Sequence, residues 1–194
     1  YVDFAAGKKG SLMVEGTENL FTNPRFENGG NGWTVSGSAT VDNTESIAKL
    51  SKPAAATDGF YQNFPSLVEG DTYFIRCRVK YISGSVRFGG HMGPAQTGTN
   101  GFMRVRIDEG SWMVNSYIDV PNDGNFHNVD ILITVGTGYT DNRIFIQPGR
   151  LEAIATEFYV EYAQFEHKSY PTPFQIGTRA APVKQITLPQ ALPA

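Results

Sequence analysis

Arginine side chains recur at every second position in two stretches of the sequence. Arg76 and Arg78 alternate with apolar residues in the first stretch, and Arg104 and Arg106 do the same in the second. A guanidinium group binds a carboxylate, sulfate or phosphate through two parallel hydrogen bonds, and it also stacks on flat groups. If these stretches are strands of one sheet, they form a face suited to an acidic glycan or to an acidic patch on a neighbouring protein. The predicted face comprises Phe74, Arg76, Arg78, Arg104, Arg106 and Phe145.

A second interpretation stays open for the arginines. The arginines alternatively form cross-strand ion pairs on a solvated face, with partners such as Asp119 and Asp130.

Exposed aromatic faces can stack on sugar rings. Trp33 and Trp112 are candidates for the core, whereas Tyr117 falls on the opposite side of its stretch from Trp112. Tyr117 is therefore the predicted stacking residue.

Groups that could perform catalysis show no convergent arrangement in the sequence. The three histidines, His91, His127 and His167, lack the spacing of metal ligands such as His-x-x-x-His. No Gly-x-Ser-x-Gly motif occurs. Carboxylates that could pair in a glycosidase, such as Glu152 and Glu157, are common residues, and the sequence gives no separation between them. The chain is therefore predicted not to be an enzyme.

Composition excludes several classes of partner. The net charge of −3 leaves no basic excess, which argues against nucleic-acid binding. No apolar run approaches the roughly 18 residues of a membrane span, so no membrane insertion is predicted. Cys77 is the only cysteine, which rules out a disulfide within the chain. It alternates in phase with Ile75 and Val79, so it is predicted to pack in the core rather than to act as a nucleophile.

The elements that carry these residues are predicted from alternation. Residues 73–81, 102–108, 128–135 and 143–147 alternate between apolar and polar side chains, as half-buried antiparallel strands do. The chain has 21 glycines and 11 prolines, many of them between the apolar runs, which indicates frequent turns. The pattern predicts an all-β fold of two facing antiparallel sheets.

Three regions follow along the chain. Residues 1–22 are predicted to form an N-terminal arm or lead-in strand, and residues 23–167 the sandwich. Residues 168–194 contain five prolines and are predicted to form an extended C-terminal arm, because proline donates no ladder hydrogen bond and blocks helix interiors.

Several short motifs follow one another in a recognisable order. An Asn, a Phe-Glu pair and a Gly-Trp pair lie within residues 19–33, a Gln-containing strand leads to Gly-x-x-Tyr within 61–73, and a long alternating strand spans 158–166. This order resembles carbohydrate-binding-module-like jelly-roll domains. Residues 170–179 look like a phrase that follows such domains in bacteriophage tail and fibre proteins. The resemblance spans residues 19–179 and implies a jelly-roll β-sandwich of a kind that often binds glycans.

The same resemblance implies a structural calcium ion and no other cofactor. In the resembling domains the calcium is often held by the Glu of the Phe-Glu motif and by an acid on the closing strand. Glu27 matches the first position. The second is usually Asp, and this chain has Glu161 there. Calcium prefers several oxygen ligands, which carboxylates and backbone carbonyls supply.

Taken together, these features predict a non-catalytic structural or adhesion module of a phage or phage-like virion, in a tail, fibre, spike or head decoration. Its expected partners are other virion proteins, further copies of itself in a trimer or larger assembly, and a cell-surface polysaccharide. Extended arms at both ends favour this setting, because an arm loses entropy on ordering unless it lies on something. The alternative is an extracellular carbohydrate-binding module of a polysaccharide-degrading enzyme.

Overall fold

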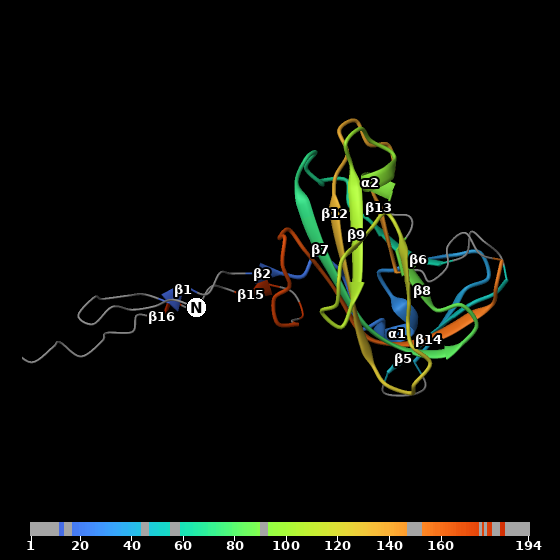
Figure 1. Cartoon of the computed structure of the whole chain (residues 1–194). Helices are drawn as coiled ribbons and strands as arrows, with labels where there is room; N and C mark the ends of the chain where they lie inside the picture. The colour runs from blue at the N-terminus through green and yellow to red at the C-terminus, as the bar shows by residue number, and fades with distance from the viewer. Residues whose placement is uncertain are drawn as a thin grey trace, which may run out of the picture.

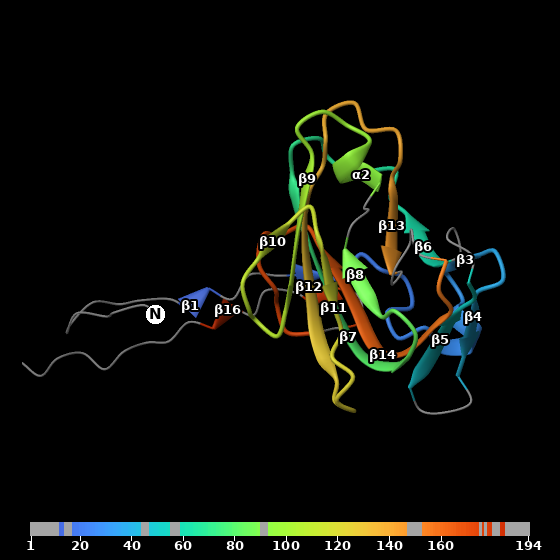
Figure 2. The ribbon, with the colours of Figure 1, turned by 45° about the vertical axis from the view of Figure 1, so that its right-hand side comes forward.

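The computed structural model describes residues 12–13, 17–43, 47–54, 59–89, 93–146, 153–174, 176, 178–179 and 183–184. These residues are almost entirely in antiparallel strands and turns, and the strands form two facing layers (Figures 1 and 2). The predicted all-β, jelly-roll sandwich is therefore confirmed. Two four-residue turns, α1 (Glu27–Gly30) and α2 (Gly93–Gln96), lie in connections between strands, and Asn28 and Gly29 of α1 have left-handed backbone angles.

The larger layer is a seven-stranded antiparallel sheet in the order β10-β9-β12-β7-β14-β5-β4. Its long central strands alternate buried and partly exposed residues, which is the period-two pattern expected from the sequence. The strands are β4 (Thr40–Asp42), β5 (Ala48–Lys52), β7 (Thr72–Ser83), β9 (Phe102–Ile107), β10 (Met113–Val114), β12 (His127–Thr134) and β14 (Thr156–Glu166).

The facing layer consists of a three-stranded sheet, β13-β6-β3, and a two-stranded sheet, β11-β8. Its strands are β3 (Thr34–Ser36), β6 (Gly59–Asn63), β8 (Arg87–Gly89), β11 (Tyr117–Asp119) and β13 (Arg143–Ile146). The inner faces of both layers meet in one core, where Phe88 of β8 contacts Phe158 of β14 at a ring-centroid distance of 5.7 Å. Each layer consequently has an outer face that points away from the core.

Two sequence-based expectations about the core are confirmed. The Trp33 ring stacks on Phe26 at 4.2 Å between centroids, and its indole N–H donates a hydrogen bond to the Asn23 carbonyl oxygen over 2.8 Å. Cys77 is fully buried on β7, and this burial raises the pKa of its thiol. A neutral, inaccessible thiol packs as a small apolar side chain.

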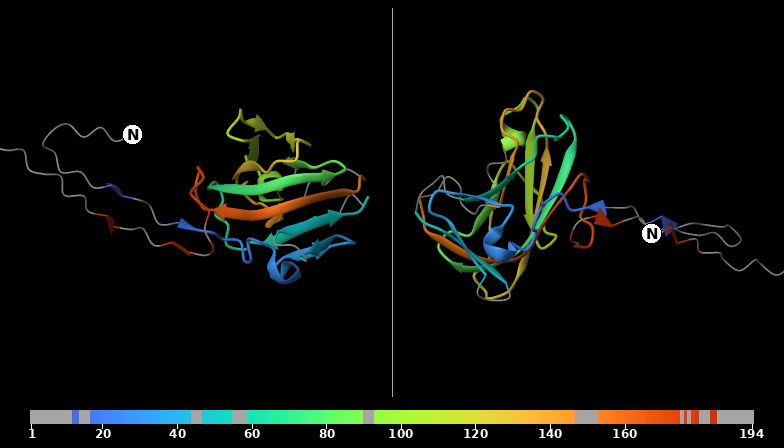
Figure 3. Two further views of the ribbon diagram at one scale, coloured as in Figure 1. Left: turned by 90° about the horizontal axis from the view of Figure 1, so that it is seen from below. Right: turned by 180° about the vertical axis from the view of Figure 1, so that it is seen from behind.

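The two ends of the chain run beside each other. β2 (Thr17–Glu18) pairs with β15 (Thr178–Arg179), and β1 (Leu12–Met13) pairs with β16 (Val183–Lys184), both antiparallel. Figure 3 shows these pairs extending away from the sandwich. All strands of the two layers lie between residues 34 and 166, inside the sandwich predicted at residues 23–167. Of the predicted arms, residues 1–11, 14–16, 175, 177, 180–182 and 185–194 lie outside the described part of the chain.

Within the described residues, no helix combines the length and the apolar character needed to cross a bilayer.

Candidate functional site

Most of the predicted arginine face lies on one sheet. β12 pairs with both β7 and β9, so Asp130 stands opposite Arg76 on one side and Arg106 on the other. Leu132 likewise stands opposite Phe74 and Arg104. Because side chains two residues apart point to the same side of a strand, Phe74, Arg76, Arg78, Arg104 and Arg106 share the outer face of the seven-stranded sheet.

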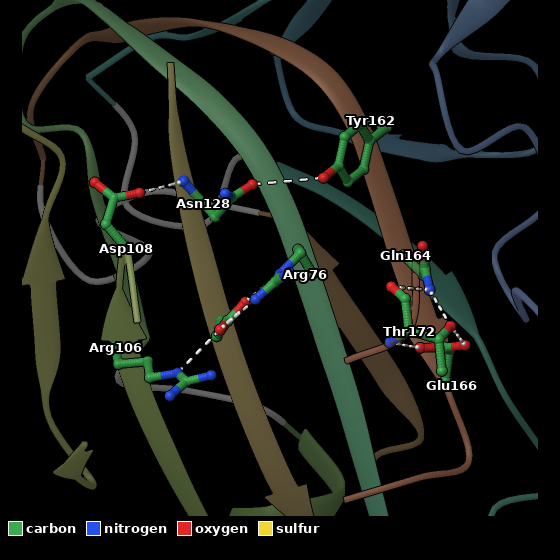
Figure 4. A network of polar contacts seen from close by, with 9 residues as sticks. Arg76, Arg106, Asp108, Asn128, Tyr162, Gln164, Glu166 and Thr172 are labelled. Atoms are coloured by element: carbon green, nitrogen blue, oxygen red, sulfur yellow. Dashed lines mark hydrogen bonds and ion pairs between the residues drawn. The ribbon is translucent and has the colours of Figure 1, made fainter. Parts of the chain in front are cut away.

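Three of the four arginines on this outer face are held by carboxylates. Asp130, fully buried, accepts hydrogen bonds from Arg76 Nε over 2.6 Å and from Arg106 Nε over 2.9 Å (Figure 4). The hydrogen bonds to Asp130 raise the pKa of Arg76. Arg78 pairs with Glu161. This is the cross-strand arrangement of the alternative interpretation, so these arginines are committed to partners within the chain.

The chain's own segments also cover part of the face. The Trp112 ring lies over the Arg106 guanidinium at 4.5 Å and meets Phe74 edge-on at 6.4 Å. Phe74 is 1% exposed although it lies outside the core between the layers. Trp112, a candidate core residue from its sequence position, is instead half-buried on this outer face.

The start of the predicted C-terminal arm crosses the same face above β14. Thr172 donates to the buried Glu166 carboxylate through its backbone N–H (3.2 Å) and its hydroxyl (2.5 Å), and Gln164 Nε2 donates to the Thr172 hydroxyl over 3.1 Å (Figure 4). Further on, Phe174 stacks on Tyr162 at 4.1 Å. Residues 170–174 therefore form a strap on the sandwich rather than a detached arm.

A polar hollow opens at the side of this face. Its volume is about 650 Å³, and its lining residues are Arg25, Glu27, Asn28, Asn43, Ile47, Ala48 and Glu161. Glu161 reaches it because the β14 register shifts between Val160 and Tyr162, which makes Glu161 the unpaired residue of a bulge. Glu27 and Glu161, the two predicted calcium ligands, thus line one hollow.

One of the two carboxylates in the hollow already has a partner within the chain. Glu161 is bound by Arg78, and Asn43 Oδ1 accepts a hydrogen bond from the Gly29 N–H over 3.0 Å. Within the described residues no group of three or more His, Cys, Asp or Glu side chains is placed to hold a metal ion. Calcium stays a prediction, and a comparison of melting temperatures with and without a chelator tests it.

Phe145 was predicted to share the arginine face, and the structure corrects this; Tyr117, the predicted stacking residue, does not join that face either. Phe145 lies on β13, which pairs with β6, and Tyr117 lies on β11, which pairs with β8. Both strands belong to the facing layer. The error has a simple cause: alternation assigns a side chain to a side of its own strand, but it does not say which sheet the strand joins.

The outer face of the facing layer carries a cluster of two aromatic rings, an arginine and an aspartate. The Tyr61 ring, half-buried on β6, lies 5.1 Å from the Phe145 ring across the strand pair. The Arg143 guanidinium lies over both rings, at 5.6 Å from Tyr61 and 5.2 Å from Phe145. Asp141 accepts two hydrogen bonds from the Arg143 guanidinium, each 2.7 Å long. These four residues are called the Tyr61 cluster.

Electrostatics hold the Tyr61 cluster in one arrangement. The hydrogen bonds to Asp141 raise the pKa of Arg143, and those from Arg143 lower the pKa of Asp141. Phe145 is 4% exposed and backs the Tyr61 ring. Thr34, opposite Tyr61 on β3, and Asn63, opposite Arg143, are exposed beside the cluster. The Tyr61 cluster therefore combines a partly exposed tyrosine ring with an arginine whose guanidinium is held in place by Asp141.

Sequence reasoning found only one member of the Tyr61 cluster as a candidate binding residue. Phe145 is that residue, whereas Tyr61 and Arg143 enter the sequence analysis only as members of predicted strands. A signal was present: Arg143 and Phe145 alternate with the apolar Ile144 and Ile146 along one predicted strand. The pairing of β13 with β6, which joins them, is separated by some 80 residues of chain and is not readable from alternation.

A second polar group lies where β12 begins, and it sets a pH dependence. His127 Nδ1 lies 2.5 Å from Asp108 Oδ2, and His127 Nε2 lies 3.0 Å from Asp123 Oδ1. Burial lowers the pKa of His127, but its hydrogen bonds to Asp108 and Asp123 outweigh this, and the net pKa is raised. The bond to His127 lowers the pKa of Asp123 to about 2. The protonated histidine therefore ties two loops together.

The sign of the effect on stability follows from linkage. Because the folded pKa of His127 is raised, its contribution is fully present below the unfolded pKa of about 6.5 and is lost as the pH rises through the folded pKa. Asp123 adds stability above its unfolded value, which is lost as the pH falls toward about 2. We expect the melting temperature to fall from neutral to mildly alkaline pH, and this slope to flatten in His127→Gln. Equal slopes in both proteins would contradict the assignment.

No protein-family model matches this chain, and no curated protein matches it in sequence. Solved structures of carbohydrate-binding domains are similar to it in fold. One is the CBM22-1 xylan-binding domain of Paenibacillus barcinonensis Xyn10C, with a TM-score of 0.46, 11% identity, and coverage of 84% of this chain and 99% of that domain.

Two further solved structures show a similar degree of likeness. The N-terminal cellulose-binding domain of Cellulomonas fimi β-1,4-glucanase C has a TM-score of 0.46 and 16% identity, covering 78% of this chain and 98% of that domain. A family 29 carbohydrate-binding module from Piromyces equi has a TM-score of 0.37 and 12% identity, covering 82% of this chain and 91% of that module. These similarities concern the arrangement of strands, and the ligands named belong to those domains.

Proposed function

We propose that this chain is a non-catalytic carbohydrate-binding module that binds a polysaccharide at the Tyr61 cluster. The observation that supports the proposal is the half-buried Tyr61 ring, which contacts the Phe145 ring and the Arg143 guanidinium. Asp141 holds that guanidinium in place through two hydrogen bonds. Sugar rings present C–H groups that pack on an aromatic face and hydroxyls that need hydrogen-bonding partners at set positions. The cluster offers both.

The two outer faces differ in what they leave available to a ligand. On the seven-stranded sheet, Arg76 and Arg106 are paired with Asp130 and are only 16% and 18% exposed, and the strap covers part of β14. On the facing layer, Arg143 is also paired, but it retains 39% side-chain exposure, and the neighbouring Thr34 and Asn63 are exposed. An ordered but accessible arginine loses little entropy when it binds, which favours the facing layer.

Replacing Tyr61 by alanine is the direct test. We expect Tyr61→Ala to weaken binding by at least about tenfold, because each tenfold step corresponds to only about 1.4 kcal/mol and buried aromatic anchors commonly contribute more. The measurement is affinity electrophoresis against a panel that includes xylan and cellulose derivatives. Tyr159→Ala is the matched control, since Tyr159 is another half-buried tyrosine beside a cation, Lys80, but lies on the other sheet. Equal losses in both variants would contradict the proposal.

A second candidate function is a structural or adhesion module of a phage-like virion. The pairing of β2 with β15 and of β1 with β16 favours it. Isolated two-stranded ribbons are marginally stable in water, so a ribbon leaving the sandwich is better accounted for if it lies on a neighbouring subunit. A trimer or larger assembly in solution supports this candidate, and a monomer that binds polysaccharide supports the free module. The chain would act on a virion in the first case and outside the cell in the second.

A further inference from the structure

Among the described residues of the seven-stranded sheet, one arginine on the outer face has no carboxylate partner. Arg104 is exposed on β9, and within the described residues it makes no ion pair. The neighbouring Arg76 and Arg106 share the single carboxylate of Asp130, and Glu109 adds a more distant attraction to Arg76. Three guanidinium groups therefore face two carboxylates. The region keeps a positive charge centred on Arg104.

Apolar and aromatic side chains surround this charge. The Arg104 guanidinium lies over the Phe102 ring at 5.2 Å, and Val114, 58% exposed, stands directly opposite Arg104 on β10. Arg106 lies two residues further along β9, about 7 Å from Arg104. Its guanidinium lies 4.5 Å from the centroid of the half-buried Trp112 ring. These residues, Phe102, Arg104, Arg106, Trp112 and Val114, are called the Trp112 platform.

The Trp112 platform is shaped for a flat, negatively charged ligand. β9 pairs with β12 along its whole length and with β10 at Arg104 and Val105, so the backbone edge beside Arg104 is already occupied. Sheets that bind peptides commonly do so through such an edge, which disfavours an acidic peptide here. A ligand on this face must be held by ring contact and by ion pairing. Arginine supplies the second through a planar, two-pronged contact with a carboxylate.

We propose that the Trp112 platform is a second binding surface, for a carboxylated polysaccharide such as a polyuronate. A uronate ring packs against the accessible part of Trp112, and its carboxylate pairs with Arg104. This surface is separate from the Tyr61 cluster, which lies on the other layer, so it extends the proposed function to a second ligand class. Because the attraction is partly electrostatic and exposed, its strength falls with added salt.

The experiment measures binding of the whole chain to polygalacturonate, with xylan and polyglutamate as further arms. We expect binding to polygalacturonate that weakens with salt and falls about tenfold or more in Arg104→Ala. Arg104→Lys, which keeps the charge but loses the planar contact, is expected to bind at an intermediate level. Lys49→Ala is the matched control: Lys49 lies toward the far edge of the same sheet, on β5, and pairs with Glu157. Exposed positions such as Arg104 tolerate alanine, so folding is retained.

The possible results separate this proposal from the first one. If polygalacturonate does not bind, or binds Arg104→Ala as tightly as the unchanged chain, the Trp112 platform is not a binding surface. Polyglutamate binding of equal strength would also overturn the proposal, since it would indicate a general site for acidic polymers. If Tyr61→Ala rather than Arg104→Ala loses polygalacturonate, the acidic glycan lies on the Tyr61 cluster, which overturns this proposal and leaves the proposed function standing.

Discussion

Replacing Asp130 by alanine is expected to lower the free energy of unfolding by about 3–5 kcal/mol, the range for breaking a buried ion pair by removing one partner. Asp130 is fully buried, and its two oxygens bind Arg76 and Arg106, whose side chains are 16% and 18% exposed. Without the carboxylate, two poorly solvated guanidinium groups would face each other across β12. Urea unfolding followed by circular dichroism measures the change.

Asp119→Ala is the matched control for Asp130. Asp119 also pairs with an arginine on a neighbouring strand, Arg87, over 2.7 Å, but its side chain is 68% exposed. Exposed pairs contribute about 0–1 kcal/mol, so this variant is expected to remain close to the unchanged chain. Comparable losses in the two variants would show that the burial of Asp130 has no energetic consequence.

Trp33→Ala is expected to cost about 3–5 kcal/mol, as the removal of a large core side chain usually does. Trp33 contacts Phe26 at 4.2 Å and Phe21 at 4.8 Å between ring centroids, and its N–H bond to Asn23 fixes the loop before α1. Deleting the ring leaves a cavity and removes one of the two hydrogen bonds to the Asn23 carbonyl oxygen, which also accepts from the Phe26 N–H over 3.1 Å. Thermal unfolding monitored by calorimetry gives the loss.

The other tryptophan serves as the comparison for Trp33. Trp112 is half-buried on an outer face and contacts Arg106 and Phe74 there. We expect Trp112→Ala to cost clearly less than Trp33→Ala, because its ring is already partly in water and its removal leaves no enclosed cavity. A larger loss of unfolding free energy in Trp112→Ala than in Trp33→Ala would contradict the assignment of Trp33 to the core and of Trp112 to an outer face.

The sequence was sufficient for the fold class because alternation reports directly on half-buried strands. Ile75, Cys77 and Val79 point into the core, and Arg76 and Arg78 point away from it, as their positions predict. Chain order alone, however, places β13 far from β6, and only tertiary pairing brings Phe145 beside Tyr61. Local patterns therefore gave the side of each strand, whereas the composition of each sheet depended on long-range contacts.

The candidate sites were less predictable than the fold for a related reason. The arginines were correctly placed on one face, but their ion pairs with Asp130 and Glu161 depend on cross-strand register and on a one-residue bulge in β14. The position of the strap was also not predictable, because Thr172 and Phe174 are held on β14 by side-chain contacts that leave no local pattern in the sequence. The virion interpretation rests on short phrases of sequence, and the structure contributes only the pairing of the two ends.

The most direct test of the central claim is to map the backbone amide signals of the whole chain by nuclear magnetic resonance during titration with a neutral polysaccharide that binds. The account predicts that the largest shifts occur in β6, β3 and β13, around Tyr61, Thr34 and Arg143, and that they disappear in Tyr61→Ala. Shifts confined to β7, β9 and β12 would contradict it, because they would place the neutral ligand on the opposite face of the sandwich.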